Sequence, residues 1–139
     1  MIRDTAREVA RGEFAPRALK ADEKGEFPAE NIKKMAELGL LGIPVPQEYG
    51  GAGAGVLAFA LVMEEIASVC ASTALTLAAH TSLGTMPILD FGSEAQPRKY
   101  VPRLAVGEIL GSYGLTEPGA GSDAGGTQTK ACRQEGGGD

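Results

Sequence analysis

The sequence predicts a mainly α-helical chain that ends in one or two β-strands. Apolar residues recur at helical spacing over much of residues 2–103, which favours about five or six helices there. After Glu108, apolar residues that favour strands lie close together over residues 109–115, and a glycine-rich run follows them. We therefore expect a helical domain over residues 1–107 and the incomplete beginning of a β domain over residues 108–139.

The composition is that of a soluble globular domain. At 139 residues, with 43% hydrophobic and 22% charged residues, the chain is long enough for one core. Its net charge of −5 argues against nucleic acid or an anionic membrane as the main partner. The longest apolar run, residues 56–63, is too short to span a bilayer.

The cysteines and the histidine indicate neither a disulfide framework nor a metal site. Cys70 and Cys132 lie outside any CxxC pattern, and His80 is the only histidine, so we expect two free thiols and no bound metal. Free thiols indicate a reducing compartment. Because Met1 leads straight into a charged helix with no targeting segment, the expected location is cytoplasmic, or the mitochondrial matrix in a eukaryotic cell.

Residues 1–40 are predicted to form solvent-facing helices, with eight basic and eight acidic side chains among them. A helical apolar stripe predicts the first helix, which Pro16 is expected to kink or end. Pro28 suits an early position in the next helix, and Gly39 is its expected stop. Residues 43–46 read Ile-Pro-Val-Pro, and this alternation of apolar residues with prolines predicts an extended connector.

Residues 41–97 contain no Lys or Arg. Residues 56–63 are apolar around a whole helix, so we expect that helix to be buried on nearly every side. A second helix over residues 72–91 is lined with small side chains, which permit close helix contact or leave room for a ligand. Ser93 and Gln96 fit a capping box for one more short helix.

A glycine-rich turn follows the predicted strand. Residues 113–123 read Tyr-Gly-Leu-Thr-Glu-Pro-Gly-Ala-Gly-Ser-Asp. Glycine lets a ligand approach the main chain, and successive exposed N–H groups, with the hydroxyls of Thr116 and Ser122, make a concave anion site. No Lys or Arg occurs over residues 104–129, so a phosphate bound here must rely on dipoles or on another part of the assembly.

Two other interpretations of this turn stay open. A glycine-rich turn after a strand is most often a hairpin tip. Residues 119–124 also fit the dinucleotide pattern GxGxxA, but Glu-Pro precedes the first glycine and more glycines follow where a helix is required. This context disfavours a dinucleotide-binding helix.

Taken in order, residues 113–123 resemble the flavin-binding signature of the acyl-CoA dehydrogenase family. The spacing of the resemblance runs without an obvious gap over essentially all 139 residues. It extends upstream through these further motifs: Phe27-Pro28, Leu38-Gly39-Leu40-Leu41-Gly42, Pro46-Gln47-Glu48-Tyr49-Gly50-Gly51, Ser82-Leu83-Gly84, Pro87-Ile88 and Phe91-Gly92.

The resemblance implies the N-terminal helical domain of this family over residues 1–107 and the start of its middle β domain over residues 108–139. It also implies FAD as cofactor and the removal of two hydrogens across the α–β bond of an acyl-CoA thioester. In the family, the base that takes the α proton comes from a C-terminal helical bundle. The sequence contains no such bundle, so no catalytic residue is assigned, and the fragment is expected to be inactive by itself.

The resemblance also assigns binding residues by position. Ser122 is expected close to both the flavin and the CoA moiety, and Thr116 near the flavin ring. The cofactor-binding residues are Tyr113, Leu115, Thr116, Gly121 and Ser122. The helix that begins at Ser72 is expected to form one wall of the acyl pocket, with core packing as the alternative for its three residues. These substrate-binding residues, besides Ser122, are Leu75, Ala79 and Leu83.

Other polar residues receive structural roles. Glu117 is expected to accept backbone N–H bonds within the turn and not to act as a catalytic base. Glu64 and Glu65 are expected to be carboxylates on a helix face. His80 corresponds to a position that faces the pocket region in the family, yet a hydrogen-bonded structural histidine is the favoured interpretation.

The partners implied by the resemblance are an acyl-CoA substrate, an electron-transferring flavoprotein as electron acceptor, and further copies in a homotetramer of the intact protein. The fragment itself is expected to self-associate through apolar surface around residues 55–91 and an unpaired strand over residues 109–115. Residues 133–139 are polar and glycine-rich, and end where a hairpin would return.

Two alternative functions remain. An acyl-CoA oxidase or a flavin monooxygenase of the same fold would share these helices. A non-catalytic helical module that binds acyl-CoA or another protein is the alternative outside the enzymes.

Overall fold

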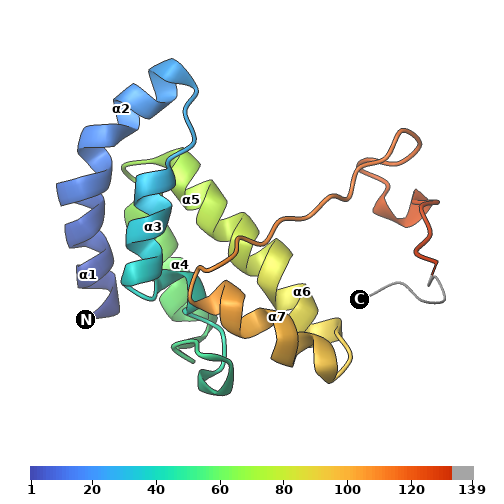
Figure 1. Cartoon of the computed structure of the whole chain (residues 1–139). Helices are drawn as coiled ribbons and strands as arrows, with labels where there is room; N and C mark the ends of the chain where they lie inside the picture. The colour runs from blue at the N-terminus through green and yellow to red at the C-terminus, as the bar shows by residue number, and fades with distance from the viewer. Residues whose placement is uncertain (133–139) are drawn as a thin grey trace.

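The computed structural model describes residues 1–132, and these residues are mainly helical (Figure 1), as the sequence predicts. None of the helices in this part is long and apolar enough to cross a membrane. The α-helices are α1 Ile2–Val9, α2 Ala15–Lys24, α3 Ala29–Glu37, α4 Gly55–Ala67, α5 Ala71–Ala78, α6 Met86–Phe91 and α7 Ala95–Ala105.

Two π-helical segments carry helices past prolines. The segment Ala10–Phe14 joins α1 to α2, and Ala79–Thr85 joins α5 to α6. Proline lacks an N–H group and its ring clashes with the carbonyl four residues earlier, and a wider turn before it relieves the clash. The first helix therefore bends near Pro16 without ending there (Figure 1), and residues 71–91 form one long helical run.

The main core lies between α1, α3, α4 and α5, and the first π-helical segment closes one side of it. Its largest fully buried side chains include Phe14, Met35, Leu41, Ile66 and Leu77. A smaller cluster around Val45 and Val101 holds α7 against the connector that follows α3. The connector is turned at its start and not extended as expected, because Ile43 has helical φ and ψ and the Val45 N–H donates to the Gly42 carbonyl at 3.2 Å. Ile43 and Val45 are both fully buried.

The prediction that residues 56–63 are buried on nearly every side is wrong for this chain. Val62 is fully buried, but Val56 and Leu57 are 73% and 75% exposed. A helix that is apolar all round needs neighbours on all sides, and residues 1–132 supply them on one side only. Large apolar side chains are also exposed further along the chain, at Leu75, Leu83 and Phe91.

A glycine turns the chain out of α7. Gly107 has φ of +75°, its N–H donates to the Leu104 carbonyl, and the Glu108 N–H donates to the Arg103 carbonyl. A Cβ atom on Gly107 would lie 2.6 Å from the Ala36 Cβ, so the turn after α7 packs tightly against α3. This is the predicted exit of the chain from the helices.

The strand expected after Glu108 does not form among the described residues. Residues 109–116 are extended but make no β-ladder, and the only β-bridge in residues 1–132 joins Glu117 to Ala120. A strand exists only as part of a pair, and residues 1–132 offer this segment no partner. The tail over residues 133–139, where a returning hairpin was expected, lies outside the described residues.

A buried carboxylate ties α1 to α4. Glu65, with only 7% of its side chain exposed, accepts hydrogen bonds from Arg7 Nη2 at 2.7 Å and Nε at 2.9 Å, and from Arg3 Nε at 2.7 Å. These bonds, from Arg7 first and then Arg3, lower the pKa of Glu65 from 4.5 to about 2. Glu65 is therefore a structural ion pair on the inner face of α4, in line with its expected role.

The low pKa of Glu65 predicts an acid-dependent loss of stability. A carboxylate whose pKa is lower in the folded state stabilises the fold above its unfolded value of about 4.5, and this contribution is lost as the pH falls towards about 2. We expect the melting temperature of the unmodified chain to exceed that of Glu65→Gln above pH 4.5 and to approach it near pH 2. Glu64→Gln is the control, because Glu64 is 66% exposed and should leave the pH profile unchanged. Parallel profiles for the chain and Glu65→Gln would contradict this assignment.

Candidate functional site

The glycine-rich motif forms a compact loop that stands apart from the helices at the end of the extended segment (Figure 1). The Glu117 N–H donates to the Ala120 carbonyl and the Ala120 N–H donates to the Glu117 carbonyl, each at 3.0 Å. Pro118 and Gly119 are the corner of this tight turn. A second turn follows, in which the Gly126 N–H donates to the Asp123 carbonyl at 3.0 Å.

The Glu117 carboxylate links the start of the loop to its end at Gln128 and Thr129. Its Oε1 accepts the Gln128 N–H at 2.5 Å, and its Oε2 accepts the Thr129 N–H at 3.0 Å and the Thr129 hydroxyl. These bonds, the Thr129 hydroxyl foremost, lower the pKa of Glu117 below its ordinary value. The expectation that Glu117 accepts backbone N–H bonds is confirmed. A carboxylate that is ionised and already hydrogen-bonded is poorly suited to take a proton from a substrate.

The residues expected to contact a cofactor lie on the outside of this structure. Tyr113 is 56% exposed and Leu115 is 40% exposed, and Thr116, Gly121 and Ser122 are exposed as well. Within the described residues, the N–H groups of Gly119, Gly121 and Ser122 make no backbone hydrogen bond. A Cβ atom on Gly114, Gly119 or Gly121 would meet nothing within 4 Å. The loop therefore presents free donors to open space, which fits a ligand that accepts hydrogen bonds.

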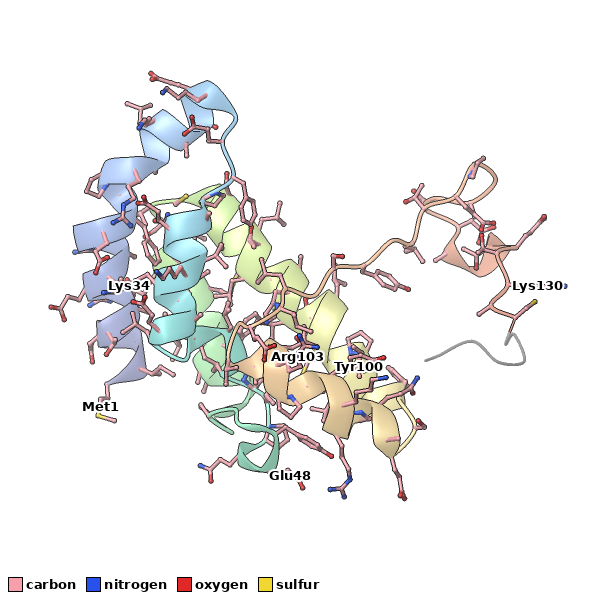
Figure 2. The ribbon with its side chains drawn as sticks, viewed as in Figure 1. Met1, Lys34, Glu48, Tyr100, Arg103 and Lys130 are labelled. Atoms are coloured by element: carbon pink, nitrogen blue, oxygen red, sulfur yellow. The ribbon has the colours of Figure 1, made fainter. Side chains whose placement is uncertain are left out.

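Basic side chains are sparse around the loop. Figure 2 shows Arg103 on α7, at the start of the extended segment, and Lys130 beyond the far end of the loop. Arg103 is bonded to the Glu108 carboxylate through Nε and Nη2, both at 2.8 Å. An anion at the loop would thus be held chiefly by backbone dipoles, with Lys130 as the basic residue nearest in sequence.

The three residues expected to line an acyl pocket do not belong to the core. Leu75 is 71% exposed and Leu83 is 47% exposed, while Ala79 is partly buried. The loop that carries Ser122 stands away from this helix (Figure 1), so the structure does not bring the two sets of residues together. Their joint role in one site stays a prediction.

The extended segment is nevertheless attached to that same helix. The Gly111 N–H donates to His80 Nδ1 at 3.0 Å. A Cβ atom on Gly84 would lie 2.5 Å from the Gly111 Cα, so the two backbones are in direct contact. His80 is 1% exposed, and burial lowers its pKa, an effect that the Leu104 carbonyl opposes. The expected structural histidine is confirmed for Nδ1, whereas Nε2 has no hydrogen bond within the described residues.

Comparison with known proteins decides the family. Residues 1–108 match the family model described as the N-terminal domain of acyl-CoA dehydrogenase. The chain belongs to the acyl-CoA dehydrogenase family. It is 53% identical over 131 residues to a probable acyl-CoA dehydrogenase, YngJ, of Bacillus subtilis, covering 94% of this chain and 34% of the relative. It is 48% identical over 131 residues to the short-chain-specific acyl-CoA dehydrogenase of Clostridium acetobutylicum, covering 94% of this chain and 35% of that one.

Solved structures at more than 40% identity share this fold. A chain in the structure described as the electron transferring flavoprotein of Acidaminococcus fermentans aligns with a TM-score of 0.87 and 43% identity, over 92% of this chain and 34% of that chain. The acyl-CoA dehydrogenase of Bacillus anthracis, solved in complex with FAD, aligns with a TM-score of 0.82 and 43% identity, over 91% of this chain and 22% of that chain. The chain thus spans about a third of the length of the curated relatives it matches.

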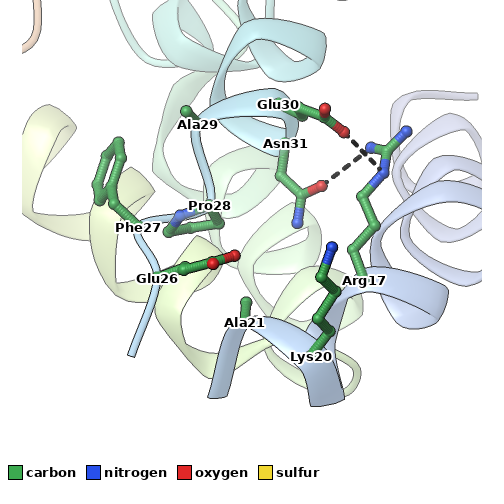
Figure 3. Close-up of a pocket in the computed structure, with 9 residues that line it drawn as sticks. All are labelled: Arg17, Lys20, Ala21, Glu26, Phe27, Pro28, Ala29, Glu30 and Asn31. Atoms are coloured by element: carbon green, nitrogen blue, oxygen red, sulfur yellow. Dashed lines mark hydrogen bonds and ion pairs between the residues drawn. The ribbon is translucent and has the colours of Figure 1, made fainter. Parts of the chain in front are cut away.

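A surface hollow of about 260 Å³ lies apart from the residues expected to bind the cofactor or the acyl chain, although Phe27 and Pro28 of the upstream motifs line it. It is lined by residues of α2, α3 and the link between them (Figure 3). Arg17 crosses it to donate to the Asn31 side chain at 3.1 Å, and pairs with Glu30 at 3.2 Å. Asn31 in turn donates to Thr73, which donates to the Cys70 thiol, each at 3.0 Å. The hollow is therefore the outer end of a polar chain that ties α2 and α3 to α5.

Sequence reasoning missed the series of hydrogen bonds from Arg17 through Asn31 and Thr73 to Cys70. It also missed the contact between His80 and Gly111. Both join residues that are far apart in sequence, and neither side chain type nor spacing marks them. The nearest signals were a lone polar residue on an apolar helix and glycines that no predicted turn required. Both cysteines are free, as expected, and no group of acidic, histidine and cysteine side chains in residues 1–132 could hold a metal ion.

Proposed function

We propose that this chain is the helical part of an FAD-dependent acyl-CoA dehydrogenase, an oxidoreductase that introduces a double bond between the α and β carbons of an acyl-CoA thioester. Residues 1–107 are its N-terminal helical domain and residues 108–139 begin its middle β domain. The observation that carries the proposal is the loop over residues 117–129, which presents unbonded N–H groups to open space within a motif of this family. The FAD complex of the Bacillus anthracis relative supports FAD as the cofactor.

The loop binds and orients the cofactor in this proposal. FAD, when bound, supplies the acceptor for the hydride that leaves the β carbon. Tyr113 and Leu115 offer apolar surface beside it, and Thr116 offers a hydroxyl near the ring. Gly121 and Ser122 offer N–H donors, and the Ser122 hydroxyl is a further donor to a flavin or CoA oxygen. Glu117 holds the loop in shape through Gln128 and Thr129.

The outer face of residues 71–91 forms one wall of the acyl site. The exposure of Leu75 and Leu83 supports this role, because exposed leucines on a helix otherwise lose the stabilisation that burial gives. Ala79, placed between them in sequence, leaves room for an acyl chain. Elements outside residues 1–139 supply the base, so the chain alone is inactive.

The remaining assignments concern the intact protein. It passes electrons to an electron-transferring flavoprotein, in keeping with the Acidaminococcus fermentans neighbour. It assembles as a homotetramer, and it works in the cytoplasm, or in the mitochondrial matrix of a eukaryote. The fragment alone self-associates through the exposed apolar side chains of α4 to α6.

A chimeric enzyme tests the proposed function directly. In the chimera, this chain replaces the matching segment of the Clostridium acetobutylicum relative. It should purify with FAD and oxidise short-chain acyl-CoA with an artificial electron acceptor. Ser122→Ala should weaken FAD or acyl-CoA binding about tenfold, because one hydrogen bond to a partly dehydrated oxygen is lost. Ser112→Ala is the control, since Ser112 is exposed on the same segment outside the motif. A folded chimera without FAD, or equal effects of the two variants, would overturn the proposal.

The pocket wall is tested by Ala79→Leu in the same chimera. A larger side chain should exclude longer acyl chains while short ones still turn over, so the rate ratio of butyryl-CoA to octanoyl-CoA should rise. If Ala79 is packing instead, overpacking would lower stability by about 1–3 kcal/mol and leave that ratio alone. Rates for both substrates are therefore measured beside the melting temperature. A lowered melting temperature with an unchanged ratio would remove Ala79 from the site.

A further inference from the structure

The flavin motif begins at a single point of attachment. Among the described residues, residues 110–116 make one hydrogen bond to the helices, from the Gly111 N–H to His80 Nδ1. The segment makes no ladder and its side chains are largely exposed, so little else fixes its course. Whatever sets the direction of residues 113–122 must therefore act at Gly111.

The geometry at Gly111 is constrained in distance as well as in hydrogen bonding. A Cβ atom on Gly111 would lie 2.8 Å from the Gly84 Cα and 3.2 Å from the His80 carbonyl oxygen. Neither Gly84 nor Gly111 has a positive φ, so glycine is required here for close approach and not for backbone conformation. The extended chain consequently lies directly on the π-helical segment Ala79–Thr85.

The π-helical segment aims its polar groups inward at this point. His80, Thr81 and Thr85 are all at least 99% buried, and the Thr85 hydroxyl donates to the His80 carbonyl at 2.8 Å. The wider π turn, which precedes Pro87, is a common device at functional sites. Because Nδ1 accepts an N–H bond, the ring proton must be on Nε2, and burial favours this neutral form.

We propose that His80 is a positioning residue for the flavin motif, whose neutral ring holds the Gly111 N–H through Nδ1 while Gly84 lets the two backbones touch. The inference rests on the proposed function, since it assigns His80 to the placement of residues 113–122. Because its side chain is 1% exposed among the described residues, His80 is assigned no contact with the cofactor or the substrate. It acts through Gly111, by fixing where the chain leaves the helices.

Two substitutions separate the hydrogen bond from packing. His80→Leu keeps a buried side chain of similar bulk but removes the acceptor. His80→Asn places an amide oxygen where Nδ1 lies and has a helix propensity similar to that of histidine. Amide hydrogen exchange of the 139-residue chain should then be at least tenfold faster at the Gly111 amide, the hydrogen-bonded one of this segment, in His80→Leu and close to the unmodified chain in His80→Asn. The exchange of α1 to α4 should be unchanged in both.

The same variants in the chimera report on the cofactor. His80→Leu should weaken FAD binding about tenfold, and His80→Asn should restore it. Equal FAD affinity in the unmodified chimera and His80→Leu, or an effect of His80→Asn as large as that of His80→Leu, would overturn the positioning role. If the unmodified chimera folds but binds no FAD, the proposed function fails, whereas the exchange data still decide whether His80 anchors residues 110–116.

A measurement without substitutions covers the case in which His80→Leu does not fold. Nitrogen-15 correlation spectra of the unmodified chain identify which ring nitrogen of His80 carries the proton. The neutral form with the proton on Nε2 is expected near neutral pH. A proton on Nδ1 would exclude an acceptor role there and overturn the proposal.

Discussion

The inward face of the helical run over residues 71–91 is the surface on which α3, α4 and α7 assemble. Its first part, α5, packs against α3 and α4, and its last part, α6, packs against α7. Between them the π-helical segment contacts α7 and carries the backbone contact with Gly111. Thr73, Leu77 and His80 on this face are all buried. One continuous helix thus links the hydrophobic core to the start of the glycine-rich loop.

The continuity of this helix depends on how the chain accommodates Pro87. An uninterrupted α-helix would place the Pro87 ring against the Leu83 carbonyl, and the π-helical segment opens the turn at that position. The same device precedes Pro16 in the first helix. The π-helical segment before Pro87 carries His80 and Thr85. The wider turn that relieves the proline clash is therefore also the place where the extended segment is attached.

The two faces of the long helix over residues 71–91 differ in how far the described residues cover them. The inner face is closed by packed helices and by polar links such as the chain from Arg17 to Cys70. The outer face exposes Leu75 and Leu83. The chain spans about a third of the length of the curated relatives it matches, and in the proposed function this exposed apolar face is one wall of the acyl site.

Local chemistry made much of the fold predictable. Helical spacing, the prolines and the change of composition after Glu108 predict the helical region and the exit of the chain, and the place of Glu117 in a glycine-rich turn predicts its backbone hydrogen bonds. The exposure of Val56 and Leu57 was not predictable. An apolar helix face predicts that something covers it, but the pattern does not say whether the covering residues lie within residues 1–132. The contact between Gly84 and Gly111 was hidden for a related reason, since close approach of two backbones leaves no pattern in either segment alone.

The most direct test of the function is a crystal structure of the chimera with FAD. The loop over residues 117–129 should lie against the cofactor, with the N–H groups of Gly121 and Ser122 donating to it and Gly111 still bonded to His80. The face of Leu75 and Leu83 should line the acyl site. FAD seated elsewhere, for example in the hollow beside Arg17, with residues 113–122 making no contact to it, would contradict the proposed function.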